Sequence, residues 1–226
     1  MRFWIALVLL LVGCDKLFGL QRVPAESPDA APGNCRLVDD FNGSVVDPMW
    51  ATDPGPGVVT ITTTGGDLVM APPPSIEGYD GIHTFLPIDV TGMIVHIDAK
   101  QPLNPGPGEI HLVAEVDPDA GGDNYYMIFA SNGYIGFRVT KGSDDETGAQ
   151  YSAIYDRYWR MRFELDGLTM AFETSRDDQD WRLRRQIPVT VPLDSLHISL
   201  GAGTYNGGIA NPGEGHFDDF SVCPTL

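Results

Sequence analysis

Residues 93–99 read MIVHIDA, and their odd positions are apolar while the even ones end in His96 and Asp98. Residues 109–116, EIHLVAEV, repeat the same period of two. Successive side chains of a β-strand point to opposite faces of the sheet, so this period predicts strands with one buried face. Both runs therefore indicate β-structure.

Further short runs of this kind lie between turn residues, at 58–63, 67–71, 124–130, 133–140, 149–155, 158–165, 168–174, 194–201 and 216–222. The chain holds 26 glycines and 18 prolines, and no window has a clear apolar period of 3.6 residues. About a dozen short strands in one domain predict an all-β fold, a two-sheet antiparallel sandwich. Residues 125–129, YYMIF, are apolar on both faces, which predicts a central strand whose second face is also covered or hollowed.

The chain begins with an apolar run, residues 3–12, that leads into Gly13-Cys14. A small residue followed by cysteine after such a run resembles a bacterial lipobox, where the cysteine is acylated and the chain is cleaved before it. The run is shorter than the roughly 20 residues that a membrane-spanning helix needs. We therefore expect a lipoprotein tethered through Cys14 to a membrane of the bacterial cell envelope. Plain secretion is the alternative, and the membrane leaflet stays open.

The sequence divides into three parts. Residues 1–13 are the expected signal peptide, and residues 14–34 carry the lipid and form a flexible tether rich in proline and alanine. Residues 35–226 are the size of one domain and are long enough to bury a substantial core. The formal net charge of −17 repels phosphates, so nucleic acid is not expected as a partner.

Acylation of Cys14 leaves two of the three cysteines, Cys35 and Cys223, near the two ends of the domain. An even pair in an oxidising compartment suggests a disulfide, and two unrelated buried thiols are the alternative.

Three stretches, taken in order, resemble the concanavalin A-like lectin/glucanase superfamily. They are DDFNG with DPMW at 39–50, YWRMR with Asp166-Gly167, Ser175, Asp178 and Trp181, and FDDFSV at 217–222. The second departs from the pattern because no glycine follows Asp178. The resemblance covers residues 36–222 and implies a jelly-roll sandwich, the fold that legume lectins, laminin-G-like modules and laminarinase-type glycosidases share. It places the first and last strands near each other, in agreement with a Cys35–Cys223 bridge.

Laminarinase-type relatives carry a Glu-x-Asp-x-(x)-Glu strand, whose alternate positions aim carboxylates into one groove. The nearest sequence here, Glu115-Val116-Asp117-Pro118-Asp119, ends in Asp and holds a proline that cannot donate to a β-ladder, so we expect a strand leaving its sheet. A second Glu-x-Asp at 164–166 precedes a glycine turn and is expected to be structural. Sequence motifs of serine hydrolases, zinc proteases and phosphate-binding loops are absent. We assign no catalytic residue.

Sugar recognition needs flat apolar rings and a few fixed polar groups. The candidate ligand-binding residues are Trp50, Tyr79, Tyr125, Tyr134, Tyr205, His111 and Glu115. Trp159 and Trp181 are expected in the core instead. His96 and His111 could be cross-strand neighbours on an outer face, where a surface or hydrogen-bonded role is favoured over a metal site.

Calcium is the expected metal, if any is bound, because hard oxygen ligands are abundant. The candidate ligands are Asp117, Asp119 and Asp123, and a second acidic run lies at 144–146. Neither run matches an EF-hand loop, and ordinary acidic loops are the alternative.

The sequence thus supports a noncatalytic domain that binds a polysaccharide or glycoconjugate. A structural or protein-interaction module of the same fold and a divergent glycoside hydrolase are the alternatives.

Overall fold

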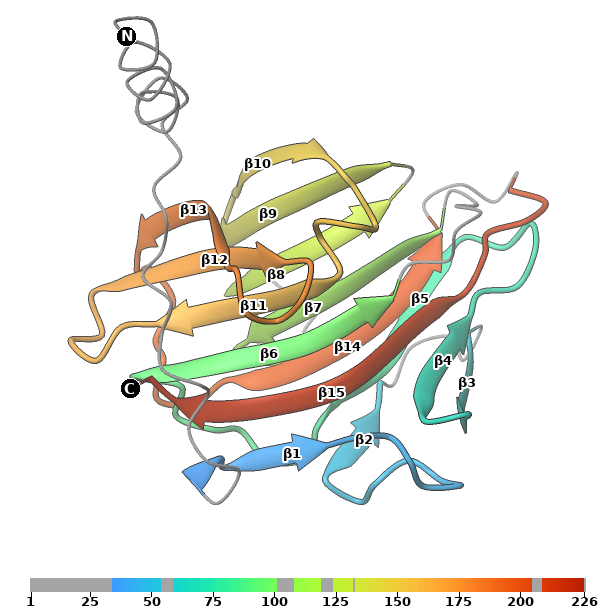
Figure 1. Ribbon diagram of the computed structural model, residues 1–226, viewed down its shortest axis with the longest axis horizontal. Helices are drawn as coiled ribbons and strands as arrows, with labels where there is room; N and C mark the ends of the chain where they lie inside the picture. Colours follow the sequence, from blue (N-terminus) through green and yellow to red (C-terminus); the bar gives the residue numbers. More distant parts are fainter. Residues whose placement is uncertain are drawn as a thin grey trace, which may run out of the picture.

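The computed structural model describes residues 34–53, 59–100, 108–118, 124–131, 133–204 and 209–225. In these ranges the regular secondary structure is almost entirely β, as predicted, and the strands form two antiparallel sheets (Figure 1). No helix among the described residues has the length and apolar character required to cross a bilayer.

Sheet A has eight strands. Its order is β13 (Arg182–Pro188), β12 (Thr169–Ser175), β11 (Tyr158–Phe163), β6 (Met93–Lys100), β15 (Gly215–Pro224), β4 (Asp67–Ala71) and β3 (Thr60–Thr64), with β1 (Leu37–Asp39) pairing with β15. The first and last strands are therefore neighbours, as the resemblance implied. The predicted disulfide between Cys35 and Cys223 is confirmed.

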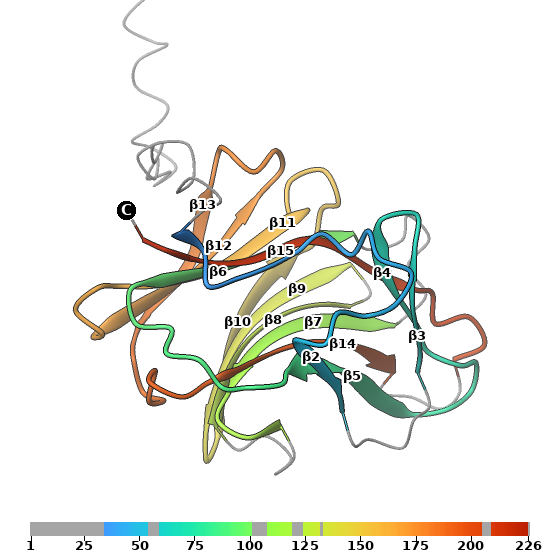
Figure 2. The ribbon, with the colours of Figure 1, turned by 90° about the horizontal axis from the view of Figure 1, so that it is seen from below.

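Sheet B has seven strands. Its order is β10 (Asp144–Gln150), β9 (Tyr134–Lys141), β8 (Asn124–Ser131), β7 (Glu109–Glu115), β14 (His197–Thr204), β5 (Gly78–Thr84) and β2 (Trp50–Thr52). Strands β7 to β10 are visibly curved (Figure 2). β7 ends at Glu115, so the chain leaves the sheet before Asp117, as expected.

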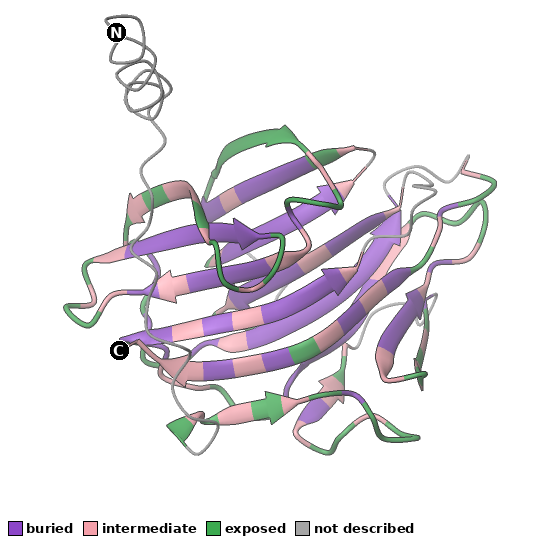
Figure 3. Cartoon of the chain, in the orientation of Figure 1, coloured by how far each residue is buried: buried purple, intermediate pink, exposed green. Residues whose placement is uncertain are grey.

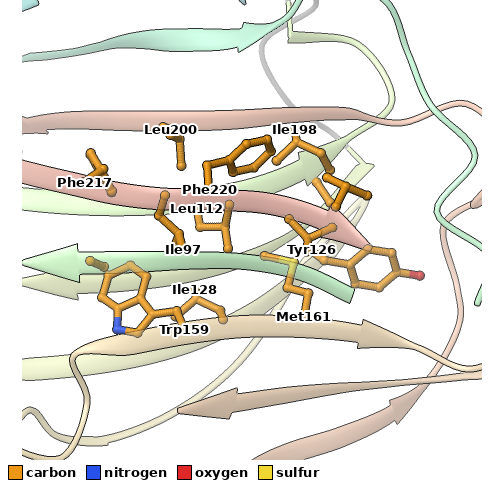
Figure 4. Packing of buried hydrophobic residues seen from close by; sticks show 14 of the residues in the cluster. Ile97, Leu112, Tyr126, Ile128, Trp159, Met161, Ile198, Leu200, Phe217 and Phe220 are labelled. Carbon is orange, nitrogen blue, oxygen red and sulfur yellow. The ribbon is translucent and has the colours of Figure 1, made fainter. Parts of the chain in front are cut away.

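The core lies between the two sheets. Trp159 and Met161 of β11 face Leu112 of β7 and Ile128 of β8 within one buried cluster (Figure 4). Strand β8 is third in sheet B, and its inward residues join this core, while Met127 and Phe129 belong to a second, separate cluster on the opposite face. The expectation of a central strand covered on both faces is therefore confirmed.

The predicted strand at 149–155 is wrong. The structure places β10 at Asp144–Gln150, and residues 151–157 form turns before β11. Every residue of β10 is exposed (Figure 3), because it is the edge strand of sheet B. With neither face packed, β10 needs no apolar alternation, and the acidic run at 144–146 is part of this strand and not of a loop.

Candidate functional site

The outer face of sheet B carries the alternate residues of the central strands. On β7, Ile110, Leu112 and Ala114 point into the core, so Glu109, His111, Val113 and Glu115 point outward. On β8, Tyr125, Met127 and Phe129 point outward, where they pack with Val113. This face therefore has its own apolar patch, outside the core.

A row of rings crosses this face at right angles to the strands. It consists of Tyr79 on β5, His111 on β7, Phe129 on β8 and Tyr134 on β9, and we call it the ring row. His111 and Phe129 are directly opposed across β7 and β8. The ring centroids of Tyr79 and His111 lie 5.9 Å apart, and those of Phe129 and Tyr134 lie 5.8 Å apart. Four strands thus contribute two pairs of contacting rings, and the pairs adjoin where His111 is opposed to Phe129.

Glycines make room for these rings. Tyr79 is opposed to Gly203, His111 to Gly201 and Phe129 to Gly136. A Cβ atom at Gly201 would lie 2.1 Å from Nε2 of His111, and one at Gly136 would lie 2.3 Å from the ring of Phe129. Each ring therefore lies across a neighbouring strand at a point where that strand has no side chain.

An arginine covers part of the ring row. The guanidinium of Arg138 lies 4.9 Å from the ring centroid of Phe129 and forms an ion pair with Glu146, 2.7 Å from Nη2 to the carboxylate. The hydroxyl of Tyr134 donates to the same carboxylate at 3.0 Å. Phe129 is consequently only 5% exposed, whereas Tyr134 is 37% exposed and is the ring most open to a ligand.

The other end of this face is polar. Glu115 accepts a hydrogen bond from the hydroxyl of Ser199 on β14, and Ser199 is directly opposed to His83 on β5. His83 Nδ1 lies 2.8 Å from the carboxylate of Asp53, which follows β2. We call Asp53, His83, Glu115, His197 and Ser199 the polar patch.

Both histidines of the polar patch are held by their Nδ1 atoms. His197 Nδ1 donates to the carbonyl of Thr84 at 2.6 Å, and its ring packs edge-on against that of His83 at 5.5 Å. Because a carbonyl only accepts, His197 carries its proton on Nδ1 when neutral, which leaves Nε2 as an acceptor. The rings are thus fixed in orientation by backbone and carboxylate groups.

Burial raises the pKa of Glu115 above its usual range. The hydrogen bond from Ser199 and the nearby His111 and His83 act in the opposite direction, and the charge of Asp53 adds to the increase. The charged form of Glu115 is therefore poorly compensated in the free protein.

The two outward glutamates of β7 do not form the carboxyl pair of a retaining glycosidase. Glu109 and Glu115 lie six residues apart on β7, which separates them by about 20 Å, whereas retaining enzymes hold their two carboxyl groups about 5–5.5 Å apart. The outward positions of the adjacent strand β8 are occupied by Tyr125, Met127 and Phe129.

The structure brings most of the candidate ligand-binding residues together, but not Trp50. Tyr79, Tyr125, Tyr134, His111 and Glu115 all belong to the outer face of sheet B. Trp50 lies in the core, 7% exposed, against Phe41 and Phe220, and its indole donates to Asp39. It closes the seam between the first and last strands and is not available to a ligand.

Several predicted site residues lie outside the described residues: Cys14, Asp119, Asp123 and Tyr205. Asp117 is exposed just after β7. The calcium site at Asp117, Asp119 and Asp123 therefore stays a prediction.

A different acidic group is present on the outer face of sheet A. Carboxylate oxygens of Asp98, Asp218 and Asp219 lie within 4.8 Å of one another. Arg157 donates to both oxygens of Asp98, and Lys100 lies 3.4 Å from Asp218, so protein cations already balance two of the three charges. His96 lies beside this group, in sheet A, so it is not a neighbour of His111 in sheet B; that cross-strand pairing was wrong.

Sequence reasoning missed the part of the polar patch that lies just after β2 and on β5 and β14. Residues 78–84, GYDGIHT, carry Asp80 and Thr84 at inward positions, which hides the apolar alternation of β5. The pattern that could have identified this strand is the outward series Tyr79, Gly81 and His83, where a ring, a glycine and a second ring occupy every second position.

No protein-family model and no curated protein sequence matches this chain. Solved structures do. An endo-β-1,3-glucanase from Pyrococcus furiosus superimposes with a TM-score of 0.61 and 12% identity, over 90% of this chain and 99% of the glucanase. An immunostimulatory antigen and pseudo β-1,3-glucanase of Mycobacterium tuberculosis superimposes with a TM-score of 0.60 and 16% identity, over 86% of this chain and 100% of the antigen. The exoplasmic/lumenal domain of VIP36, bound to Ca2+ and Man3GlcNAc, superimposes with a TM-score of 0.57 and 17% identity, over 79% of this chain and 85% of the VIP36 domain. The fold is thus the concanavalin A-like jelly roll.

Proposed function

We propose that this jelly-roll chain is a membrane-anchored, noncatalytic carbohydrate-binding protein of the bacterial cell envelope, and that its ligand lies on the outer face of sheet B. The ring row is the observation that carries the proposal. Sugars pack their C–H faces on flat rings, and a few fixed polar groups then set their orientation. The polar patch supplies such groups beside the rings.

The structural neighbours support a carbohydrate as the ligand. One was determined with Man3GlcNAc bound, and another is an endo-β-1,3-glucanase. The lack of a matching carboxylate pair on β7 and β8 supports binding without hydrolysis.

Glycan-array binding tests the proposal. The purified, disulfide-bonded protein is applied with and without calcium, and specific binding is the expected result. Tyr134→Ala should weaken binding by about three- to tenfold, since one exposed stacking ring is lost. Tyr155→Ala is the matched control, because Tyr155 is also exposed, at 41%, but packs against Arg182 of sheet A. Absence of binding in both conditions contradicts the proposal and favours a protein-interaction module.

The proposed anchor rests on the sequence around Cys14 and is tested separately. The Cys35–Cys223 disulfide is consistent with an oxidising compartment. Cells fed a clickable palmitate analogue should label the wild-type chain, and Cys14→Ser should abolish the label. Undiminished labelling of the Cys14→Ser chain would contradict lipidation at this residue.

A divergent hydrolase is the second candidate, and one observation favours it. Glu115, with its raised pKa, and Asp53 reach the polar patch from opposite sides of the Ser199–His83 pair. Two carboxyl groups in different environments can serve as acid and base. The test measures whether the protein releases new reducing ends from a bound glycan. If it does, and if Glu115→Gln abolishes the release, the function is hydrolysis and not binding alone.

A further inference from the structure

We propose that Glu115 receives an ammonium group of the ligand, so that the outer face of sheet B prefers polysaccharides whose sugar units carry free amines. This inference rests on the proposed function and adds the chemical class of the ligand.

The contacts of Glu115 are the first argument. Its hydrogen-bond partner is the neutral hydroxyl of Ser199. The residues opposed to it on the neighbouring strands are Tyr125 on β8 and His197 on β14. No arginine or lysine among the described residues forms an ion pair with this carboxylate, whereas Glu146, on the same face, is paired with Arg138.

The cost of covering Glu115 is the second argument. A neutral sugar seated on the polar patch would remove water from the carboxylate without supplying a positive charge, and a buried charge without a partner is costly. An acidic sugar would add repulsion from Glu115 and from Asp53. An ammonium group balances the charge, and the ring of Tyr125 beside it offers a further favourable contact for a cation.

The surrounding charges agree with this preference. Asp53 is the other carboxylate of the polar patch, and its own partner is His83. Over the whole chain the formal net charge is −17, which attracts cationic polymers and repels uronic acids.

Three tetrasaccharides with the same β-1,4 backbone test the inference. They are the tetramers of glucosamine, N-acetylglucosamine and glucose, which differ only in the group at C2. Calorimetric titration of the full-length protein near pH 6, at physiological salt, should show the glucosamine tetramer binding at least about tenfold tighter than the other two. In Glu115→Gln, which keeps the hydrogen bond from Ser199, the three affinities should agree within about twofold.

Glu214→Gln is the matched control. It removes the same charge from an exposed position just before β15, where Glu214 pairs with His216. If the glucosamine tetramer were attracted only by the net charge of the protein, Glu115→Gln and Glu214→Gln would each cause the same small loss of affinity. The inference requires that only Glu115→Gln removes the preference for the amine.

The pH dependence provides an independent readout. Affinity for the glucosamine tetramer should fall as the pH drops through the raised pKa of Glu115, because the protonated carboxyl no longer balances the ammonium group. The neutral tetramers should not share this fall. The ionisable groups around Glu115 are His83, His111, His197, Asp53 and Tyr125, and Tyr125 also contacts Arg138. Glu115→Gln must therefore remove the pH effect for the assignment to stand.

The outcomes separate this inference from the proposed function. Equal affinities for the three tetramers in the wild type, or an unchanged preference in Glu115→Gln, overturn it. Binding of a neutral glycan on the array, without binding of the glucosamine tetramer, also overturns it and leaves carbohydrate binding intact. Absence of binding to every glycan overturns both.

Discussion

At the scale of single residues, sheet A carries buried charges that are paired with charges of opposite sign. Arg160 is 2% exposed and Glu173 is fully buried, and Arg160 Nε donates to the carboxylate of Glu173 at 2.6 Å. Arg162 donates to the same carboxylate at 3.0 Å, and the ring of Trp181 lies 4.1 Å from the guanidinium of Arg160. Arg160, Arg162 and Trp181 belong to the second of the three stretches that resemble the superfamily. Their contacts show that this stretch has a structural role here.

Glu173→Gln should lower the free energy of unfolding by about 3–5 kcal/mol, because it leaves the buried arginine without a compensating charge. Glu164→Gln is the matched change at the surface, where Glu164 pairs with Arg162 while a third of its side chain is exposed. There we expect a loss below about 1 kcal/mol. Urea titrations of both variants measure the difference, and similar losses would show that the buried pair adds little.

Glycines of the outer face of sheet B act in two distinct ways. At Gly201 the three atoms nearest to an added Cβ belong to the ring of His111, whereas at Gly81 the Cβ would lie 2.2 Å from the backbone oxygen of Leu200. A ring can rotate away, but a backbone oxygen within the sheet cannot move without breaking the pairing of β5 with β14.

We therefore expect Gly201→Ala to displace His111 and weaken glycan binding, with a change in Tm below about 3 °C. Gly81→Ala should lower Tm by well above that amount. Thermal scans and binding assays on the two variants give the comparison. A Gly201→Ala protein that binds glycan normally would show that His111 does not need to lie flat on β14.

At the scale of elements, β15 carries a bulge between Asp218 and Ser221, and Asp219 within it has a φ of 49°. The bulge brings Asp219 beside Asp218 and Asp98. Burial, and then the charges of Asp218 and Asp98, raise the pKa of Asp219. The native state therefore disfavours the ionised form of this side chain relative to the unfolded chain.

Asp219→Asn should raise Tm at pH 7 by about 1–2 °C, because asparagine removes the charge and tolerates the left-handed backbone. The sign follows from the raised pKa: the penalty is absent in acid, where both states are protonated, and it develops as the pH rises past the unfolded value. The gain should thus disappear near pH 3. The thermal scans are run with a metal chelator, because Asp219 belongs to a group of three carboxylates that could hold a metal ion. A lower Tm for Asp219→Asn than for the wild type at pH 7 would show that the charge stabilises the bulge.

The strands that the sequence could predict are those with an apolar residue at every second position, on the side that faces the core. Strands β6, β7, β11 and β12 alternate because their inward residues fill the core, and the predicted ranges lie within a few residues of the observed ones. Strands β1 and β2 were missed because three residues are too few to show a period. The exposed edge strand β10 was misplaced because no packing constrains its composition.

The site depends on contacts between elements, which explains why only part of it was predictable. Tyrosines and His111 could be recognised by residue type, but the opposition of Ser199 to His83 depends on the pairing of β14 with β5, whose residues lie 116 positions apart. No local pattern encodes that register.

At the scale of the whole molecule, the disulfide joins the two ends of the described domain. Cys35 and Cys223 are separated by 188 positions, and the bond holds β1 against β15, its partner in sheet A. Every other strand lies between these residues in the sequence. In the chain-entropy model, closing so long a loop in the unfolded chain adds about 4–5 kcal/mol to the free energy of unfolding. Any strain in the native bond reduces this gain.

The double variant Cys35→Ser/Cys223→Ser should therefore unfold at a lower urea concentration, with a loss of up to about 5 kcal/mol. Because the bond acts mainly on the unfolded chain, the outer face of sheet B should keep its geometry, and glycan binding below the unfolding transition should be unchanged. Wild-type protein treated with a reductant should behave like the double variant. If the variant keeps the wild-type stability, strain in the native bond cancels its entropic gain. If it loses binding while still folded, the seam between the first and last strands is coupled to the distant ring row.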